Sequence, residues 1–208
     1  MCRSPASMCT ELGPDASLWP TRSPLPTPEG VRTAGTVVKQ ALEHVDAGDV
    51  ERAGDLLSGC DQDFIQSWFI VHAQNAHRFR RQHFHPEPIT AISPDQRDRP
   101  YPSKSLEREI YDRDCGRCLY CGVEVILVDD QKRLHAAVGD DVFAMGRTNL
   151  TRSGAMIATR ATADHVVPRS QGGKTTPDNL VTACWPCQFG KAEFSPSQLG
   201  LKDPRHHV

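Results

Sequence analysis

Two pairs of cysteines with the spacing of metal ligands lie in the second half of the chain. Cys118 and Cys121 form one C-x-x-C pair, and Cys184 and Cys187 form a second. Four thiolates are the ligand set that tetrahedral structural zinc prefers, and a two-residue gap lets one tight turn direct two sulfurs at the same ion. A thioredoxin-like redox centre needs one such pair at a helix start in a β-α-β setting, which this sequence does not contain. The pairs therefore predict a structural Zn²⁺ site.

The other cysteines leave one alternative open. Cys115 lies at the same two-residue spacing before Cys118 and could replace it as a ligand, although a partly buried small side chain is the simpler interpretation. The N-terminus lacks the apolar run of a signal peptide, and no stretch is long enough to span a bilayer. We therefore expect a cytoplasmic protein, no membrane partner, and thiols that stay reduced and bind metal instead of forming disulfides.

The segment between the two pairs carries an acid, an imidazole and an amide. Asp164 and His165 are adjacent at the end of an apolar stretch, and Asn179 lies in P-D-N-L. Gln188 follows the second cysteine pair directly. Taken alone, an Asp-His dipeptide says little, and P-D-N-L is more simply a turn, because Asn and Asp favour such positions. Only their combined order between two zinc-type pairs makes a functional interpretation the better one.

That combined order resembles the HNH endonuclease family. The resemblance is carried by I-Y-D-R-D-C-G-R-C-L-Y-C-G, by A-T-A-D-H-V-V-P-R-S-Q-G-G-K-T-T-P-D-N-L and by C-W-P-C-Q-F-G-K, and it covers about residues 104–194. Many members of the family hold a ββα-metal motif between two zinc-knuckle pairs. The resemblance implies an α+β fold, with a ββα-metal (HNH/His-Me finger) domain closed by a zinc clasp. It also implies a metal-dependent endonuclease that hydrolyses phosphodiester bonds in DNA.

The resemblance also assigns roles to individual residues. Asp164 would bind Mg²⁺ or another divalent cation, which prefers oxygen ligands and can neutralise charge on phosphoryl oxygens. His165 would be the general base, since neutral imidazole suits that role near pH 7. Neighbouring side chains of a strand point to opposite faces, so these two residues can serve the cation and the water separately. Asn179 would hold the loop that aligns His165.

Gln188 departs from the family pattern, which has His or Asn at this place. Its amide oxygen can coordinate a cation, but on a stem that is one methylene longer than that of Asn. We predict that Gln188 faces Asp164 and completes the catalytic cation site, directly or through a water. The departure keeps open an alternative from another class, a non-catalytic zinc-knuckle nucleic-acid-binding protein with a degenerate HNH site. The presence of Asp164, His165 and Asn179 favours the enzyme.

Overall charge does not point to a particular partner. The chain has 24 Lys and Arg against 26 Asp and Glu, so nucleic acid must be bound by a local patch and not by a basic domain. Arg169 and Lys174 flank the Gly-Gly loop and form such a patch. Lys191, one helical turn beyond Gln188, could contact a phosphate, although a solvated helix lysine is nearly as good an interpretation.

The composition predicts four segments. Residues 1–34 are rich in Pro, Ser and Thr and are expected to be disordered. Residues 35–85 form a helical region of unknown role, with a break at Gly48 and a longer helix from about Asp61 to Gln82. Residues 86–103 form a Pro-rich linker, and residues 104–208 form the nuclease domain. Within that domain we expect a strand over 123–128, an insertion or long hairpin over 129–155, and a second strand that ends near His165.

Overall fold

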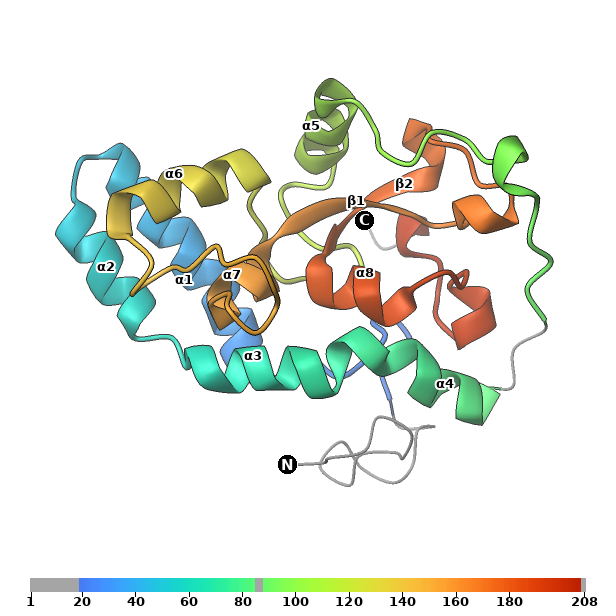
Figure 1. The fold of residues 1–208 in the computed structure, drawn as a ribbon, viewed down its shortest axis with the longest axis horizontal. Helices are drawn as coiled ribbons and strands as arrows, with labels where there is room; N and C mark the ends of the chain where they lie inside the picture. The colour runs from blue at the N-terminus through green and yellow to red at the C-terminus, as the bar shows by residue number, and fades with distance from the viewer. Residues whose placement is uncertain (1–18, 85–87, 207–208) are drawn as a thin grey trace.

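The computed structural model of the protein describes residues 19–84 and 88–206. Its α-helices are α1 Glu29–Asp46, α2 Val50–Ser58, α3 Gln62–Val71, α4 Ala76–Phe84, α5 Lys104–Arg113, α6 Val128–Val138, α7 Gly154–Thr159 and α8 Trp185–Lys191. Two strands, β1 Ala161–His165 and β2 Leu180–Cys184, complete the regular structure of the described residues together with short 3-10 turns. Figure 1 shows α8 beside the strands, with α3 and α4 along one side of the molecule and α5 on the other.

The two strands and α8 form the unit that carries the chemistry. β1 pairs with β2 in antiparallel register, with Ala161 opposite Cys184 and His165 opposite Leu180. The chain enters α8 directly after Cys184, and α8 packs against both strands. A helix rises about 1.5 Å per residue, so its seven residues span about 10 Å. The predicted α+β fold with a ββα unit and a helical N-terminal region is confirmed.

The N-terminal helices follow the expected pattern with one change. α1 and α2 are separated at Gly48, which has a φ of +82°, a conformation that glycine adopts at little cost. The helix expected over residues 61–82 is instead interrupted after α3. There the side-chain amide of Gln74 donates to the Ile70 carbonyl at 2.8 Å, and Asn75 does so at 3.4 Å. These amides compete for an acceptor that a continuous helix would use for its own backbone.

The helical region shares a hydrophobic core with the middle of the chain. Phe69 and Leu57 lie in the same buried cluster as Leu134, Phe143 and Ile157. The first turn of α7 approaches α3 so closely that a Cβ at Gly154 would collide with the Gln62 carbonyl. Residues 29–84 therefore pack directly on part of the segment 104–208, which the sequence predicts to be the nuclease domain.

Residues 19–34 differ from the disorder expected for them, whereas residues 1–18 lie outside the described part. Trp19 and Leu25 are 5% and 4% exposed, and α1 already begins at Glu29. The buried guanidinium of Arg80 donates to the carbonyls of Pro20, Ser23 and Pro24, and to that of Leu199. A few apolar anchors and one buried arginine hold this segment, which composition alone does not reveal.

The segments around the predicted strand and linker also differ from expectation. Residues 123–128 make only isolated bridges, Glu124 with Arg117 and Ile126 with Arg160. Of the insertion or long hairpin expected over 129–155, the structure shows helix α6 in the first part and no long hairpin among the described residues. Residues 88–103, expected as a free linker, lie along the C-terminal unit, where the Ile92 N–H donates to the Ser170 carbonyl at 2.8 Å. No helix within the described ranges is both long and apolar enough to cross a bilayer.

Candidate active site and metal centre

The four predicted zinc ligands converge on one point. The sulfur atoms of Cys118, Cys121, Cys184 and Cys187 all lie within 4.8 Å of one another, and those of Cys121 and Cys184 are 3.6 Å apart. Tetrahedral zinc with Zn–S bonds of 2.3 Å places its sulfurs about 3.8 Å apart. The geometry and the donor set therefore fit a structural zinc ion. Cys115 is exposed and lies outside the cluster, so the geometry favours Cys118 over Cys115 as the fourth thiol.

Local backbone structure explains why the two pairs meet. The first pair forms a turn in which the Gly122 N–H donates to the Cys118 carbonyl at 2.8 Å, and Gly122 has a φ of +78°. The Leu119 N–H donates to the Thr182 carbonyl at 2.9 Å and ties this turn to β2. The second pair spans the end of β2 and the first turn of α8. The hydrogen bond between Leu119 and Thr182 thus holds the first turn beside the strand that leads into the second pair.

The electrostatics of the thiol cluster favour a bound cation. Burial raises the pKa of Cys184 well above its usual value. Burial also acts to raise the pKa of Cys118, but hydrogen bonds from the other three thiols lower it well below the usual value. A Zn²⁺ ion supplies the charge that lets all four sulfurs ionise.

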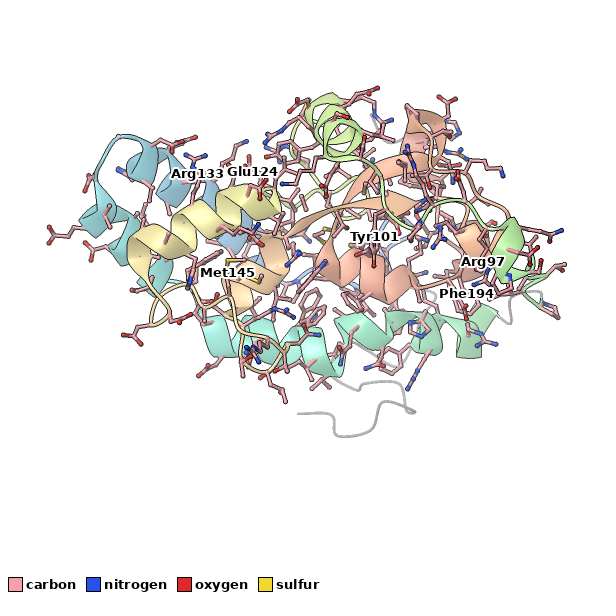
Figure 2. All side chains as sticks on the ribbon, turned by 45° about the horizontal axis from the view of Figure 1, so that its top comes forward. Arg97, Tyr101, Glu124, Arg133, Met145 and Phe194 are labelled. Atoms are coloured by element: carbon pink, nitrogen blue, oxygen red, sulfur yellow. The ribbon has the colours of Figure 1, made fainter. Side chains whose placement is uncertain are left out.

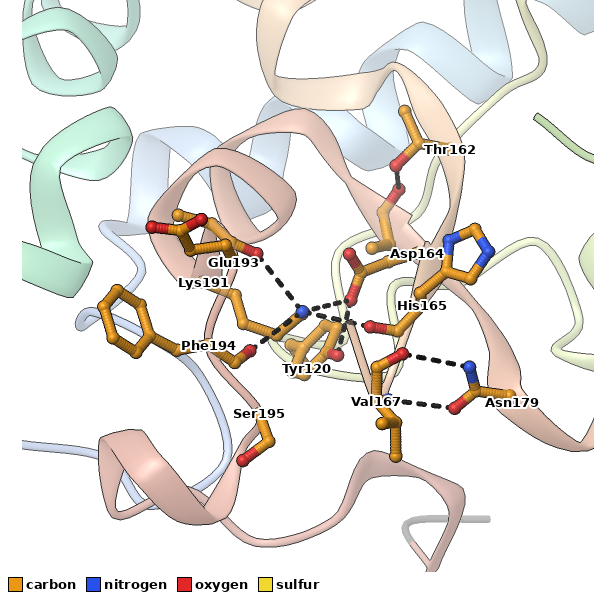
Figure 3. Close-up of polar contacts among 12 residues, drawn as sticks. Tyr120, Thr162, Asp164, His165, Val167, Asn179, Lys191, Glu193, Phe194 and Ser195 are labelled. Atoms are coloured by element: carbon orange, nitrogen blue, oxygen red, sulfur yellow. Dashed lines mark hydrogen bonds and ion pairs between the residues drawn. The ribbon is translucent and has the colours of Figure 1, made fainter. Parts of the chain in front are cut away.

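Asp164 lies near the end of β1 and is almost fully buried, with 5% exposure. Its Oδ2 accepts a hydrogen bond of 2.7 Å from the Tyr120 hydroxyl and lies 3.4 Å from the Lys191 ammonium, as Figure 3 shows. Burial raises the pKa of Tyr120 well above its ordinary value, so this hydroxyl stays protonated and donates. Burial also raises the pKa of Asp164, with Lys191 and then Tyr120 acting in the opposite direction.

His165 is held by a hydrogen-bond relay. Its ring contacts the Thr175 hydroxyl, and that hydroxyl contacts the backbone of Arg99 in the segment before α5. Its Nε2 lies 3.0 Å from the Thr175 hydroxyl, and that hydroxyl donates to the Arg99 carbonyl at 2.8 Å. A hydroxyl has one proton to donate, so Thr175 accepts from the His165 Nε2–H. The Nδ1 atom of the neutral ring therefore keeps its lone pair. Burial, followed by the charges of Arg169 and Lys191, lowers the pKa of His165 to about 4.

This relay makes Thr175 a positioning residue that can be tested. We expect Thr175→Val to lower the cleavage rate by about 10–100-fold, the range typical of a group that orients a functional imidazole. Thr175→Ser keeps the hydroxyl and should restore most of the rate. Thr176→Val, at the exposed neighbouring position, is the matched control. A Thr175→Val variant that cleaves at the parent rate would show that the hydroxyl does not position His165.

Asn179 lies directly before β2 and holds the loop that follows His165. Its side-chain oxygen accepts from the Val167 N–H at 2.9 Å. Its amide group donates to the Val167 carbonyl at 3.0 Å and to the Lys174 carbonyl at 2.9 Å. A Cβ at Gly173 would collide with the Val167 carbonyl, so glycine is required where the loop closes on itself. The contacts of Asn179 are those of a residue that fixes this loop.

Asp164 and His165 open onto a cleft of about 320 Å³. Its other lining residues come from three segments of the chain and include Arg97, Pro100, Arg169, Lys191 and Glu193. Figure 2 places Arg97 and Tyr101 in the half of the molecule that holds the strands and α8. Arg169 lines the cleft and also donates to the Asp98 carbonyl at 2.8 Å, whereas Lys174 is exposed. The residues that line the cleft therefore include two carboxylates, one imidazole, one ammonium and two guanidinium groups.

Lys191 and Gln188 occupy positions that differ from those expected. Lys191 is 1% exposed, and its ammonium donates to the His165 and Phe194 carbonyls at 3.1 Å each. It is thus neither a solvated helix lysine nor a surface contact for phosphate. Gln188 is half-buried on α8 and is not among the residues that line the cleft. Lys191, and not Gln188, is therefore the α8 residue that contacts the Asp164 carboxylate.

The cleft fits a divalent cation in its donor chemistry. Asp164 offers a carboxylate, the oxygen ligand that Mg²⁺ prefers, on the cleft wall beside His165. One of its oxygens already accepts from Tyr120 and pairs with Lys191. Asp164 is therefore the residue that would hold the cation. The ammonium of Lys191 would compete with the cation for the Asp164 carboxylate.

Sequence reasoning missed several residues that shape this site. Tyr120 contacts Asp164, and Thr175 and the backbone of Arg99 hold His165. Asp98 accepts from the Thr175 N–H at 2.8 Å. The sequence signal for Tyr120 was its position between Cys118 and Cys121. The signal for Asp98 and Arg99 was absent, because their contacts come from how residues 88–103 lie over the loop.

Comparison with known proteins supports one assignment. Neither the curated proteins nor the solved structures gave a match to this chain. A family model described as HNH endonuclease matches residues 151–189. That segment contains Asp164, His165, Asn179 and the second cysteine pair, and the match indicates a nuclease or nucleic-acid-binding function. The resemblance found in the sequence is confirmed, because residues 151–189 match the model of the HNH endonuclease family.

Proposed function

We propose that the protein is a metal-dependent endonuclease that hydrolyses phosphodiester bonds in DNA. The observation that carries this proposal is the orientation of His165, whose Nε2 is held by Thr175 while its ring lines a cleft shared with Asp164. A binding module does not need an imidazole in one tautomer beside a buried carboxylate. A general base needs that arrangement, because its free nitrogen must meet a water molecule.

The proposed reaction uses His165 and Asp164, which both line this cleft. Nδ1 of His165 accepts a proton from a water molecule, and the resulting hydroxide attacks phosphorus and displaces the 3′ oxygen, which takes up a proton from solvent water and leaves as a 3′-hydroxyl. A divalent cation bound by Asp164 would supply charge neutralisation at the phosphoryl oxygens and the leaving oxygen. Tyr120 keeps the Asp164 carboxylate in place through its hydrogen bond of 2.7 Å. Asn179 keeps the backbone after His165 in register through three hydrogen bonds.

Basic groups around the cleft support a nucleic-acid substrate. Arg97 and Arg169 line it, and Lys174 is exposed on the neighbouring loop. Contacts of this kind bind the phosphate backbone without reading sequence. Arg169 and Lys174 thus remain the proposed substrate contacts, with Arg97 added to them.

The alternative function is a zinc-knuckle protein that binds nucleic acid without cleaving it. One observation favours it: the ammonium of Lys191 lies at the carboxylate that the cation would need. The departure at Gln188 points in the same direction. The two functions differ in one measurable property, which is turnover.

Cleavage of supercoiled plasmid by the zinc-loaded protein distinguishes them. We expect nicked and linear products when Mg²⁺ or Mn²⁺ is added, and no products after dialysis against a buffer without divalent cation. A gel-shift assay on the same DNA should show binding in both buffers. Binding without cleavage at every cation concentration would select the non-catalytic alternative.

The lowered pKa of His165 predicts the acid side of the pH profile. The base form is active, and a pKa of about 4 means that this form persists as the pH falls below neutrality. An imidazole with an ordinary pKa near 6.5 would be about nine-tenths protonated at pH 5.5. We therefore expect the single-turnover rate at pH 5.5 to stay within about threefold of that at pH 7. A tenfold fall over this range would show that His165 titrates as an ordinary histidine.

A further inference from the structure

The ammonium of Lys191 lies in a buried cage of oxygen atoms. Its Nζ is 3.4 Å from the Asp164 carboxylate and from the Ala192 carbonyl, and 3.1 Å from the carbonyls of His165 and Phe194. The side chain is 1% exposed. One carboxylate and several carbonyls are also the kind of environment that a hard metal cation selects. Figure 3 shows these contacts converging on the ammonium.

The zinc clasp and the end of α8 place Lys191 there. Cys187 is a cluster thiol, and Lys191 follows it by four residues, which puts both on one face of the helix. The helix ends at Lys191, and the next residue, Ala192, has a φ of +52° that turns the chain sharply. This turn brings the carbonyls of Ala192 and Phe194 onto the ammonium. The position is therefore built by the fold and does not depend on a flexible surface side chain.

We propose that Lys191 is the resident counter-ion of Asp164 and competes with the divalent cation for that carboxylate. The inference rests on the proposed function, because that function supplies the cation. Two positive charges at one buried carboxylate repel each other, so the cation binds as the ammonium gives up its contact with Asp164. By linkage, Lys191 weakens cation binding by the same factor by which the cation weakens the Lys191–Asp164 contact.

The cleft gives the displaced ammonium a second partner. Lys191 is among the residues that line the cleft of about 320 Å³, so its ammonium can move toward a phosphate bound there. Cation binding would then free the ammonium for the phosphate, so the cation and the nucleic acid would each favour binding of the other.

The test is Mn²⁺ binding to the zinc-loaded protein without DNA, measured from the electron paramagnetic resonance signal of free Mn²⁺. Lys191→Met removes the charge and keeps the length of the side chain. We expect it to bind Mn²⁺ about tenfold more tightly or better than the parent, a difference of about 1.4 kcal/mol. Lys132→Met, an exposed lysine on α6, should match the parent. Asp164→Asn in the Lys191→Met background should remove the added affinity.

A folded Lys191→Met variant with unchanged or weaker Mn²⁺ affinity overturns the proposal. Zinc content and the melting temperature report whether this variant folds. A second measurement uses the parent itself, by following the ¹H–¹⁵N resonance of the buried Lys191 ammonium, assigned with Lys191→Arg, as Mg²⁺ is added. A resonance that does not change up to saturating Mg²⁺ also overturns it. Neither readout involves DNA, so failure here is distinct from failure to cleave.

Discussion

Cys184→Ala is expected to abolish zinc binding and to unfold the region around β1, β2 and α8. The free energy with which zinc-finger peptides bind their structural zinc is roughly 10–16 kcal/mol and appears as folding free energy. Cys184 is 1% exposed, ends β2 and belongs to the four-thiol cluster. Loss of the clasp would free both the turn that carries Tyr120 and the first turn of α8. The variant should contain no tightly bound zinc, and amide exchange in β1 and β2 should become fast.

Cys115→Ala is the matched control for this substitution. Cys115 lies three residues before Cys118, but it is exposed and outside the cluster. The control should keep about one zinc per chain and the melting temperature of the parent. If Cys184→Ala melted like the parent and neither protein contained zinc, the thiol cluster would not be a metal centre.

His165→Ala is expected to leave the fold and the zinc content intact and to lower the cleavage rate by about 10²–10⁴-fold, the usual contribution of a general base. The ring is half-buried and makes one side-chain hydrogen bond, to Thr175. Its removal therefore disturbs little packing. The measurement is the single-turnover rate on plasmid DNA at saturating enzyme, which separates chemistry from product release.

His44→Ala, on α1 and away from the cleft, is the control for loss of an imidazole. It should cleave at the parent rate. Added imidazole should restore part of the activity of His165→Ala if the missing group acts as a base. A folded, zinc-loaded His165→Ala that cleaves as fast as the parent would remove His165 from the mechanism.

The parts of the site that chemistry fixes locally could be predicted from the sequence. A C-x-x-C pair needs only a tight turn to present two sulfurs, so the two cysteine pairs were identifiable by spacing, although the same spacing left Cys115 as an alternative to Cys118. The α+β fold and the ββα unit were implied by the resemblance of the segment around His165 to the HNH endonuclease family. These features require few long-range contacts to be recognised.

The parts that depend on tertiary contacts could not be predicted. The place of Lys191 depends on the turn at Ala192 and on carbonyls that only the folded chain brings together. The role of Thr175 depends on Arg99, which lies 76 residues away in the chain. Residues 123–128 have strand composition, yet they pair only through isolated bridges. The β-propensity of a segment indicates that it can form a strand, whereas the segments packed beside it determine whether it pairs as one.

The origin of the oxygen added during cleavage tests the central claim most directly. Zinc-loaded protein is incubated with DNA and Mn²⁺ in ¹⁸O-labelled water under single-turnover conditions, and the new termini are analysed by mass spectrometry. A hydrolytic site with His165 as base predicts one ¹⁸O atom in a 5′-phosphate, an unlabelled 3′-hydroxyl, and a strongly reduced yield with His165→Ala. Bound but uncut DNA, or products that form equally with His165→Ala, would contradict the account.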